Sequence, residues 1–323
     1  MEEKKRPLLI LTGPTAAGKT DLSIGLARAV GGEIISADSM QVYKKMNIGT
    51  AKIRPEEMGG VPHFLVDILD PSEEFNVVRF QHMAKEAMEG IYERGHIPIL
   101  VGGTGFYIQA VLYDIDFSAH EENESYRRYL TVLAEEKGKE YLYAMLKKVD
   151  AEYAATLHAN NVKKVIRALE YHHETGGKLS AHNAAQREKK SPYNFLYFVL
   201  NNTRDILYDR MNRRVDKMME QGLLQEVESL VRAGYDRRLP SMQGIGYKEF
   251  FDYFDGKCTL EEAVEQVKLD TRHFAKRQLT WFRREKDVIW MQKDAYAGEE
   301  ELLRAMLRKT AEKGIGPAAG TVV

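Results

Sequence analysis

Cysteine is nearly absent from the sequence, since Cys258 is the single residue of its type among 323. This excludes a disulfide framework and any zinc site built from several cysteines. Long hydrophobic runs are also absent, because stretches such as Leu8–Leu11 and Ile97–Val101 are far too short to span a bilayer. The N-terminus is charged and leads directly into an apolar run, unlike a signal peptide. We therefore expect a soluble cytoplasmic protein that has no membrane partner.

The sequence has no excess of charge of either sign. It contains 47 lysines and arginines against 48 aspartates and glutamates, which gives a formal net charge of −1. Its 44% hydrophobic and 29% charged residues are typical of globular proteins and exclude a disordered or fibrous chain. Taken as a total, the balanced charge argues against a polyanionic partner such as a nucleic acid.

Short apolar runs alternate with helix-like segments in the first hundred residues. We expect buried strands of one sheet at Leu8–Leu11, Glu33–Ala37, Phe64–Leu69, Ile97–Val101 and Phe195–Leu200. Strands that alternate with helices predict parallel βαβ units with right-handed crossovers. The expected fold class is therefore α/β with a parallel sheet.

Two further regions are mainly helical. From about residue 121 to about residue 187, helical periodicity, many charges and little strand signal predict a helical insertion. After Asn202 the sequence is again mostly helical, and Thr259-Leu260-Glu261-Glu262 has the pattern of a capping box at a helix start. We assign residues 1–118 and 192–323 to an α/β core with C-terminal helices, and residues 119–191 to the insertion.

A glycine-rich motif follows the first expected strand and precedes the first expected helix. It matches G-x-x-x-x-G-K-[ST] at every fixed position and consists of Gly13, Pro14, Thr15, Ala16, Ala17, Gly18, Lys19 and Thr20. Loop amides and the helix N-terminus would bind phosphate, Lys19 would neutralise its oxygens, and Thr20 would offer a hydroxyl to Mg²⁺. The alternative is a turn that merely caps a helix; the strand–loop–helix context favours phosphate binding.

Polar residues also follow two other expected strands, where parallel α/β sheets build their sites. Asp38, after the second strand, is either a proton acceptor near the phosphate loop or a helix N-cap. Thr104, after the fourth, either bonds to phosphate or serves the turn, and the glycines around it favour close approach of a ligand to the backbone. No carboxylate follows the fourth strand, so metal-assisted hydrolysis of ATP is poorly supported.

The balanced total charge hides two basic segments. Residues 160–190 contain seven lysines and arginines against three acids, and residues 271–286 contain six against one. An apolar stripe through the first segment leaves Lys163, Lys164 and Arg167 to face elsewhere. Counted locally, the same composition accommodates RNA, because basic residues bind phosphates.

The second basic segment also carries aromatic and amide side chains. Phe274 and Trp281 lie on an apolar stripe, so we expect them in the core. Gln278 and Arg283 are candidates for contact with RNA, since amides bond to bases and arginines to phosphates. The alternative is a solvated helix that binds nothing.

Together these motifs resemble the bacterial tRNA dimethylallyltransferases, also called isopentenyl-tRNA transferases, over most of the chain. The resemblance is carried by Gly13–Thr20, Ile34–Gln41, Tyr43, Asn47–Lys52, Val101–Gly105, Arg167–Glu170 and Gln243–Tyr247. It implies a P-loop NTPase-like core. The phosphate loop has Ala17 where the family usually has serine, and the lack of cysteines leaves no C-terminal zinc finger of the kind found in many eukaryotic members.

The resemblance implies that the phosphate loop binds the diphosphate of dimethylallyl diphosphate. Lys19, Mg²⁺ at Thr20, Thr104 and Arg127 would stabilise the leaving diphosphate, and Arg127 enters only through its match to the family. Asp38 would take the proton from the exocyclic N6 of the adenosine next to the anticodon, at position 37 of tRNA.

The resemblance also implies how tRNA is bound. The adenosine leaves its stack and enters a channel lined by Asp38, Ser39, Met40 and Gln41. The helical insertion would clamp the anticodon stem-loop, which would be contacted by Lys163, Lys164 and Arg167. We expect the protein to act as a monomer.

Three alternatives remain open. A P-loop small-molecule kinase would use Asp38 to orient an acceptor hydroxyl and the insertion as a lid. An adenylate isopentenyltransferase would perform the same chemistry on free AMP or ATP, and the basic insertion would then have little to do. A non-enzymatic RNA-binding module would keep the phosphate loop only for structure, which intact Lys19 and Thr20 argue against.

Overall fold

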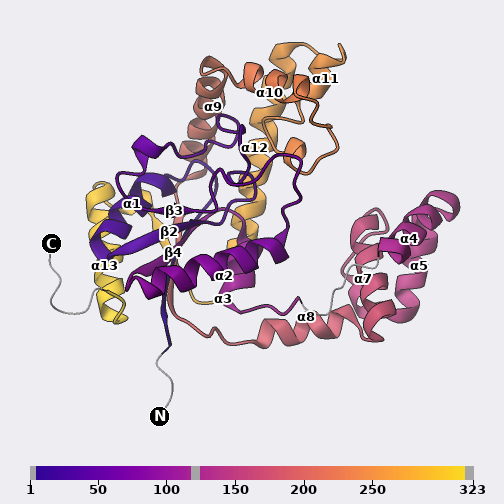
Figure 1. Ribbon diagram of the computed structural model, residues 1–323, viewed down its shortest axis with the longest axis horizontal. Helices are drawn as coiled ribbons and strands as arrows, with labels where there is room; N and C mark the ends of the chain where they lie inside the picture. The colour runs from indigo at the N-terminus through magenta and orange to yellow at the C-terminus, as the bar shows by residue number, and fades with distance from the viewer. Residues whose placement is uncertain (1–4, 118–123, 317–323) are drawn as a thin grey trace. The chain divides into compact units, whose positions relative to one another are not determined.

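The structure is a computed structural model that describes residues 5–117 and 124–316 (Figure 1). Its contacts divide the chain into two compact units, Met1–Val111 with Pro192–Val323, and Leu112–Ser191. The second unit begins before residue 119 because the segment after the first unit bonds to it. Lys189 Nζ donates to the carbonyl oxygen of Asp114 at 2.9 Å, and the Asp116 amide donates to Gln186 Oε1 at 3.3 Å.

A six-stranded sheet forms the centre of the first unit. In spatial order its strands are β3 (His63–Phe64), β2 (Gly32–Ser36), β4 (Ile97–Gly102), β1 (Pro7–Thr12), β5 (Asn194–Asn201) and β6 (Val288–Gln292). Every ladder is parallel, and in the centre Leu9 of β1 lies opposite Ile99 of β4 and Leu196 of β5. The expected parallel α/β class is confirmed.

Four of the five expected strands agree with the structure to within one residue at each end. The expected strand Phe64–Leu69 is wrong, because only His63–Phe64 pairs with β2. Leu65 and Asp67 have φ angles of 62° and 58°, which take the chain out of the extended region. Strand β6 was not expected, since it is a short, half-buried edge strand that follows a long helical region.

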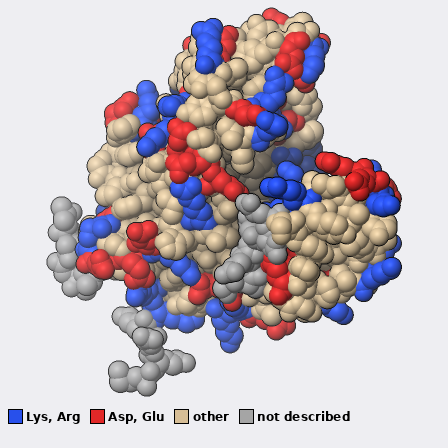
Figure 2. Space-filling model, turned by 45° about the vertical axis from the view of Figure 1, so that its right-hand side comes forward, with Lys and Arg blue, Asp and Glu red and all other residues tan. Residues whose placement is uncertain are grey.

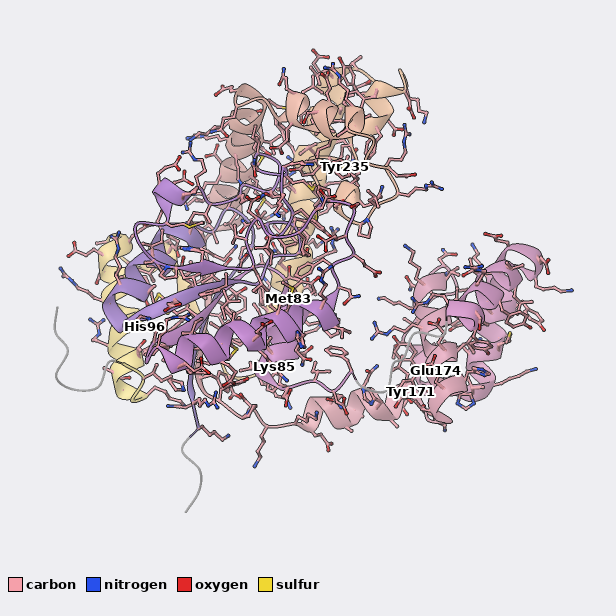
Figure 3. All side chains as sticks on the ribbon, viewed as in Figure 1. Met83, Lys85, His96, Tyr171, Glu174 and Tyr235 are labelled. Atoms are coloured by element: carbon pink, nitrogen blue, oxygen red, sulfur yellow. The ribbon has the colours of Figure 1, made fainter. Side chains whose placement is uncertain are left out.

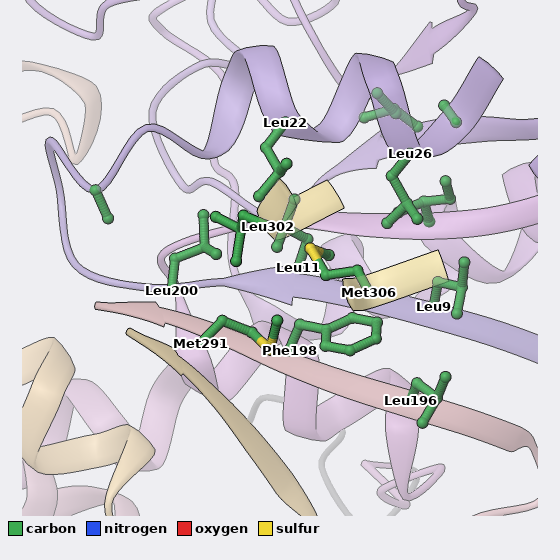
Figure 4. Close-up of a cluster of buried hydrophobic side chains, with 14 of the residues drawn as sticks. Leu9, Leu11, Leu22, Leu26, Leu196, Phe198, Leu200, Met291, Leu302 and Met306 are labelled. Atoms are coloured by element: carbon green, nitrogen blue, oxygen red, sulfur yellow. The ribbon is translucent and has the colours of Figure 1, made fainter. Parts of the chain in front are cut away.

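One face of the sheet packs against α1 (Lys19–Val30) and α13 (Glu299–Glu312), which lie next to each other. The apolar cluster between these layers includes Leu9, Leu11, Leu22, Leu26, Phe198, Leu302 and Met306 (Figure 4). Helix α2 (Val77–Glu93) packs against β2 and β4, and α3 (Gly105–Leu112) follows β4. This packing fixes the start of α1, and with it the phosphate loop, at the carboxyl end of β1.

Four α-helices lie between β5 and β6 in the chain, namely α9 (Arg204–Glu220), α10 (Leu223–Arg232), α11 (Phe250–Phe254) and α12 (Leu260–Phe282). In Figure 1, α9, α10 and α11 lie above the labelled strands, and α12 runs down from them. The expected capping box at the start of α12 is confirmed: the Glu262 amide donates to Thr259 Oγ1 at 3.2 Å, and the Thr259 amide donates to Glu262 Oε2 at 2.8 Å. Helices α9 and α12 pack together, and Arg272 donates to Asn212 across their contact at 2.8 Å.

The described part of the second unit is helical throughout, as expected. It consists of α4 (Glu124–Lys137), α5 (Lys139–Val149), α6 (Ala151–Ala155), α7 (Val162–Thr175) and α8 (Leu179–Glu188). It has a core of its own, which includes Leu130, Leu142, Leu146, Val165 and Leu169. In neither unit do the described residues form a helix that is both long and apolar enough to cross a membrane.

Candidate active site

A cavity of about 550 Å³ opens in the first unit at the carboxyl ends of the central strands. This is the edge at which parallel α/β sheets build their sites. One face each of α9 and α12 contributes to its walls. The remaining lining residues come from the segments 15–20, 38–41, 49–51, 103–104 and 240–248.

The phosphate loop connects β1 to α1, so the expected strand–loop–helix context is confirmed. Gly13 has a φ of 147°, and a Cβ at this position would lie 2.4 Å from the carbonyl oxygen of Leu200, so the turn requires glycine. Lys19 is the first residue of α1, and its Nζ donates to the carbonyl oxygens of Gly13 at 3.0 Å and Pro14 at 2.9 Å. The ammonium is thereby held over the loop.

Three charged side chains face the cavity near this loop, those of Lys19, Arg214 and Asp38. Burial, and next the positive charge of Arg214, lower the pKa of Lys19 to about 8, while Asp38 opposes this shift. Burial also lowers the pKa of Arg214, again opposed by Asp38. Two partly desolvated cations thus share one carboxylate, and the site is suited to an anion that supplies the missing negative charge.

Arg214 was missed by the sequence analysis. It lies on α9 between Met211, Val215 and Met218, which line the same cavity. These four residues are spaced i, i+3, i+4 and i+7, so they share one helix face. An arginine on an otherwise apolar stripe was the available signal, but the neighbouring charges of α9 hid it.

The helix N-cap that the sequence left open for Asp38 is wrong, because the next helical element after β2 begins at Pro55, whereas the proton-accepting role stays a prediction. Asp38 Oδ1 accepts hydrogen bonds from the backbone amides of Met40 at 2.8 Å and Gln41 at 3.3 Å, which is the geometry of a local cap. Within the described chain no hydrogen bond reaches Oδ2, although Asp38 lines the cavity. One oxygen therefore fixes the side chain, and the other can accept a proton.

Two of the three glycines around Thr104 make room for protein atoms, whereas Gly103 lines the cavity together with Thr104. A Cβ on Gly102 would lie 2.1 Å from the Ala37 carbonyl oxygen, and one on Gly105 would lie 2.2 Å from the ring of Trp281. The expectation of close ligand approach is therefore wrong for Gly102 and Gly105, and it stays a prediction for Gly103. Thr104 itself lines the cavity, and its backbone amide donates to the Ala37 carbonyl oxygen at 3.2 Å.

Both aromatic residues expected in the core, Phe274 and Trp281, are only partly buried. Trp281 packs edge-on against Phe106, with ring centroids 6.1 Å apart, and covers Gly105. Phe274 is only partly buried and lines the cavity together with Val267. The expectation of a buried core position is therefore wrong for both residues: Trp281 packs over Gly105, and the apolar face of α12 that carries Phe274 forms a cavity wall.

Gln278 joins three parts of the site. Its Oε1 accepts from the Thr15 amide at 2.9 Å, and its Nε2 donates to the Gly103 carbonyl oxygen at 3.0 Å. The side chain is buried, and it links α12 to the phosphate loop and to the loop after β4. Both ends of the amide are used within the protein, so Gln278 supports the site rather than presenting a free amide to RNA.

The other residues expected along the adenosine channel also line the cavity. They are Ser39, Met40 and Gln41, which follow β2 directly after Asp38. The side-chain nitrogen Nε2 of Gln41 donates to the carbonyl oxygens of Thr50 at 3.4 Å and Ala51 at 3.3 Å. The segment after β2 is therefore tied to the segment 49–51.

Thr20 is the residue expected to bind Mg²⁺, and it is exposed at the cavity. Residues 5–117 and 124–316 contain no group of three or more histidine, cysteine, aspartate or glutamate side chains that could hold a metal ion. Mg²⁺ commonly keeps several waters and binds through substrate phosphates with one or two protein oxygens. A single hydroxyl beside a phosphate loop fits this mode and does not fit a site built from protein ligands alone.

The remaining candidates lie on exposed helix faces. In the second unit Lys163, Lys164 and Arg167 are exposed on α7. Arg127 of α4 forms an ion pair with Glu170 of α7, in which Nε lies 2.8 Å and a terminal nitrogen 3.1 Å from the two carboxylate oxygens. Arg283 is exposed at the end of α12 and is not among the cavity-lining residues.

Charged side chains of both signs are interspersed on the face shown in Figure 2. Two clusters in the first unit are internally paired and lie away from the cavity lining. Buried Glu33 accepts from Arg94 at 2.7 Å and pairs with His96, and Tyr235 donates to Asp70 at 2.8 Å. Figure 3 labels His96 and Tyr235. Their polar groups serve structure, which leaves the cavity as the candidate active site.

Comparison with known proteins gives consistent results. The family model described as IPP transferase matches residues 41–285, and the one described as isopentenyl transferase matches residues 7–68. A tRNA dimethylallyltransferase of Lachnoclostridium phytofermentans is 57% identical over 310 residues, which covers 96% of this chain and 99% of the relative.

Two solved structures extend the comparison. The tRNA isopentenylpyrophosphate transferase of Bacillus halodurans is 45% identical and has a TM-score of 0.71, with 96% of this chain and 98% of that chain covered. A eukaryotic dimethylallyltransferase acting on tRNA is 29% identical and has a TM-score of 0.82, with 98% and 81% covered. With a family model over most of its length and close relatives over nearly all of it, the chain belongs to the IPP transferase family.

Proposed function

We propose that this protein transfers a dimethylallyl group from dimethylallyl diphosphate to N6 of the adenosine at position 37 of tRNA, with release of diphosphate. The observation that carries the proposal is one cavity in which Lys19, Arg214 and Asp38 meet, in a chain of the IPP transferase family. Two cations suit a diphosphate, and the carboxylate suits the acceptor of a proton.

The diphosphate binds at the phosphate loop. The N-terminus of α1 binds it, together with loop amides other than those of Thr15 and Ala17, which bond to Gln278 and to the Pro14 carbonyl oxygen. Lys19 and Arg214 neutralise the charge that develops as the carbon–oxygen bond breaks. Thr104 donates a further hydrogen bond from the loop after β4. The Thr20 hydroxyl would help to hold Mg²⁺, which would supply additional neutralisation of the leaving group.

Asp38 acts on the acceptor. The N6 lone pair of adenine is delocalised into the ring, so the amine becomes a useful nucleophile only as its proton is removed. As the bond forms between N6 and the allylic carbon, the N6 proton passes to Asp38 Oδ2, the carboxylate oxygen that the cap leaves unused. A base inside a stem-loop cannot reach this point unless it leaves its stack, which costs a few kcal/mol.

The cavity has a suitable size and polarity for both groups. About 550 Å³ lies within the usual range of small-ligand pockets, roughly 300–1,000 Å³. Met211, Val215, Met218 and Phe274 form an apolar wall against which the dimethylallyl group and the adenine ring can pack. Ser39, Met40 and Gln41 also line the cavity.

The outer contacts to tRNA are assigned to exposed cations. Lys163, Lys164 and Arg167 of α7 and Arg283 of α12 would bind phosphates of the anticodon stem-loop. Arg127 is kept as a candidate for the diphosphate, a role that competes with its ion pair to Glu170. Activity on tRNA also implies that the protein works where tRNA is found, in the cytoplasm.

A substrate comparison tests the proposal. Labelled dimethylallyl diphosphate is supplied with unmodified tRNA, AMP or ATP in turn, and transfer is expected to tRNA alone. Transfer to AMP or ATP would instead identify an adenylate isopentenyltransferase, and phosphate transfer from ATP to a small molecule would identify a kinase. RNA binding without transfer would leave only a binding module.

Asp38→Asn isolates the proton-accepting role. Asparagine keeps an oxygen that can accept from the Met40 and Gln41 amides, so the cap survives while the charge is lost. We expect the single-turnover rate to fall by roughly 100-fold or more, with dimethylallyl diphosphate binding retained. A wild-type rate in this variant would mean that Asp38 is only a cap.

A further inference from the structure

Glu226 of α10 gathers four hydrogen bonds on one carboxylate. Its Oε2 accepts from the backbone amides of Asn47 at 2.9 Å and Ile48 at 2.8 Å. Its Oε1 accepts from the Gly49 amide at 3.1 Å and from the Tyr247 hydroxyl at 2.7 Å. Three successive amides around one anion resemble the backbone nests that proteins build for charged ligands, here filled by the protein's own side chain.

The two segments that Glu226 joins belong to the wall of the cavity. Gly49 begins the lining segment 49–51, and Tyr247 lies within the lining segment 240–248. They are also in direct contact, because a Cβ on Gly49 would lie 2.5 Å from the Tyr247 ring. The Tyr247 side chain is fully buried, so it cannot move independently of the segment that carries it.

The link extends to the segment that carries the proposed base. Gln41 bonds to the carbonyl oxygens of Thr50 and Ala51, immediately after the amides that Glu226 holds. The side chain of Met40 fills the space above Gly244, where a Cβ would lie 2.4 Å from the Met40 methyl group. Three chain segments therefore form one wall, and Glu226 stands at their junction.

The protonation state of Tyr247 favours its hydrogen bond to Glu226. Burial, and next the charge of Glu226, raise the pKa of Tyr247 well above its ordinary value, so the phenol stays protonated and donates. Glu226 and Tyr247 are absent from the cavity lining, and neither contacts the phosphate loop in the described structure. Any effect on the reaction is exerted through the segments that they hold.

We propose that Glu226 is a positioning residue that fixes the acceptor wall of the cavity, formed by residues 38–41, 49–51 and 243–248. It does not position the phosphate loop, residues 13–20, which binds the diphosphate. The inference rests on the proposed transfer to tRNA. Without the carboxylate, three backbone amides lose the acceptor that holds them together. The turn 47–49 then shifts away from Tyr247, and the adenine is held less well beside Asp38.

The test compares Glu226→Gln and Tyr247→Phe with the wild type. Glu226→Gln removes the charge and places an amide nitrogen against amide donors, whereas Tyr247→Phe removes one of the four bonds and keeps the ring. We expect kcat/KM for tRNA to fall on the order of 10- to 100-fold in Glu226→Gln and less in Tyr247→Phe, with the Kd of dimethylallyl diphosphate unchanged. Glu228→Gln is the matched control, since Glu228 lies on the same helix and pairs only with Arg232 among the described residues.

Comparing kcat/KM for tRNA with the Kd of dimethylallyl diphosphate distinguishes a positioning role from a general loss of structure. Weakened binding of dimethylallyl diphosphate in step with the loss on tRNA would overturn the proposal, as would wild-type kinetics in Glu226→Gln. If Glu226→Gln does not fold, Tyr247→Phe decides by the same comparison. A wild-type protein that fails to modify tRNA would refute the proposed function itself, and this outcome is visible in the same assay.

Discussion

At the scale of single residues, the charge of Lys19 makes diphosphate binding depend on pH. Its pKa is lowered to about 8 by burial and by Arg214, so the free protein loses this proton as the pH rises through 8. A diphosphate binds the charged form, and binding therefore raises the pKa again and takes up a proton. The site is poised at a pH where a small change alters its charge.

We therefore expect the affinity for dimethylallyl diphosphate to be nearly constant below pH 7.5 and to fall up to tenfold per pH unit above about 8. At pH 8, calorimetry in buffers of different ionisation enthalpy should detect uptake of about half a proton per ligand. Lys19→Arg, which stays charged, should remove the dependence. Equal affinities for the wild type at pH 7 and 9.5 would contradict this assignment.

At the scale of elements, Gln278 connects α12 to two loops that bear the site. Replacing it with alanine leaves the Thr15 amide and the Gly103 carbonyl oxygen without their partner, at a cost of about 1–3 kcal/mol. Because Thr15 belongs to the phosphate loop, Gln278→Ala should weaken dimethylallyl diphosphate binding by roughly 5- to 100-fold in direct titration. Gln266→Ala, at an exposed position of the same helix, is the control. Equal affinities in the two variants would show that the loop holds its shape alone.

The turn before α11 contains the buried carboxyl of Glu249, which makes the stability of the protein depend on pH. Its side chain is 2% exposed, and burial raises its pKa to about 7 although the Gly246 amide donates to it at 2.8 Å. The folded protein thus binds this proton more tightly than the unfolded chain does. The contribution to stability is largest at low pH and is lost as the pH rises from about 4.5 to 7, by roughly 3 kcal/mol.

Glu249→Gln should therefore lose less stability than the wild type between pH 5 and pH 8 in urea unfolding. Glu261→Gln, at an exposed position in the first turn of α12, should follow the wild type. Parallel stability curves for the wild type and Glu249→Gln would mean that Lys248, whose Nζ lies 3.7 Å from Glu249, keeps the carboxylate charged.

At the scale of the whole molecule, the chain has a net charge of only −1 and consists of two units. We expect cations of the second unit to bind tRNA phosphates and the cavity of the first unit to bind dimethylallyl diphosphate. Replacing Lys163, Lys164 and Arg167 with glutamine should lower the slope of log affinity for tRNA against log salt by roughly 2 to 3, because each lost phosphate contact removes up to about 0.9. Dimethylallyl diphosphate binding should not change. Glutamines at the exposed Lys139, Lys147 and Lys148 of α5 serve as the control. An equal effect from the control set would refute the assignment to α7.

A site residue could be predicted from the sequence where the residues that identify it lie next to it in the chain. The phosphate loop was found because its residues are consecutive, and Asp38 because it directly follows a strand. Arg214 was missed because the neighbouring charges of α9 hid its place on an apolar stripe. Glu226 was missed because its partners, the amides at 47–49, lie far away in the chain. Gly102 and Gly105 were misjudged because a sequence shows that space is needed but not which atoms fill it.

The phosphate loop and the acceptor wall of the cavity are supported differently, and we expect them to differ in mobility. The phosphate loop continues from β1, whose Leu8–Leu11 are fully buried and which carries a ladder on both sides. The acceptor wall is irregular chain held by a few side chains. Amide exchange should therefore be slow at the base of the phosphate loop and fast in the acceptor wall, which can open locally while the sheet stays intact. A nucleoside could then enter and leave while the protein keeps hold of its small substrate.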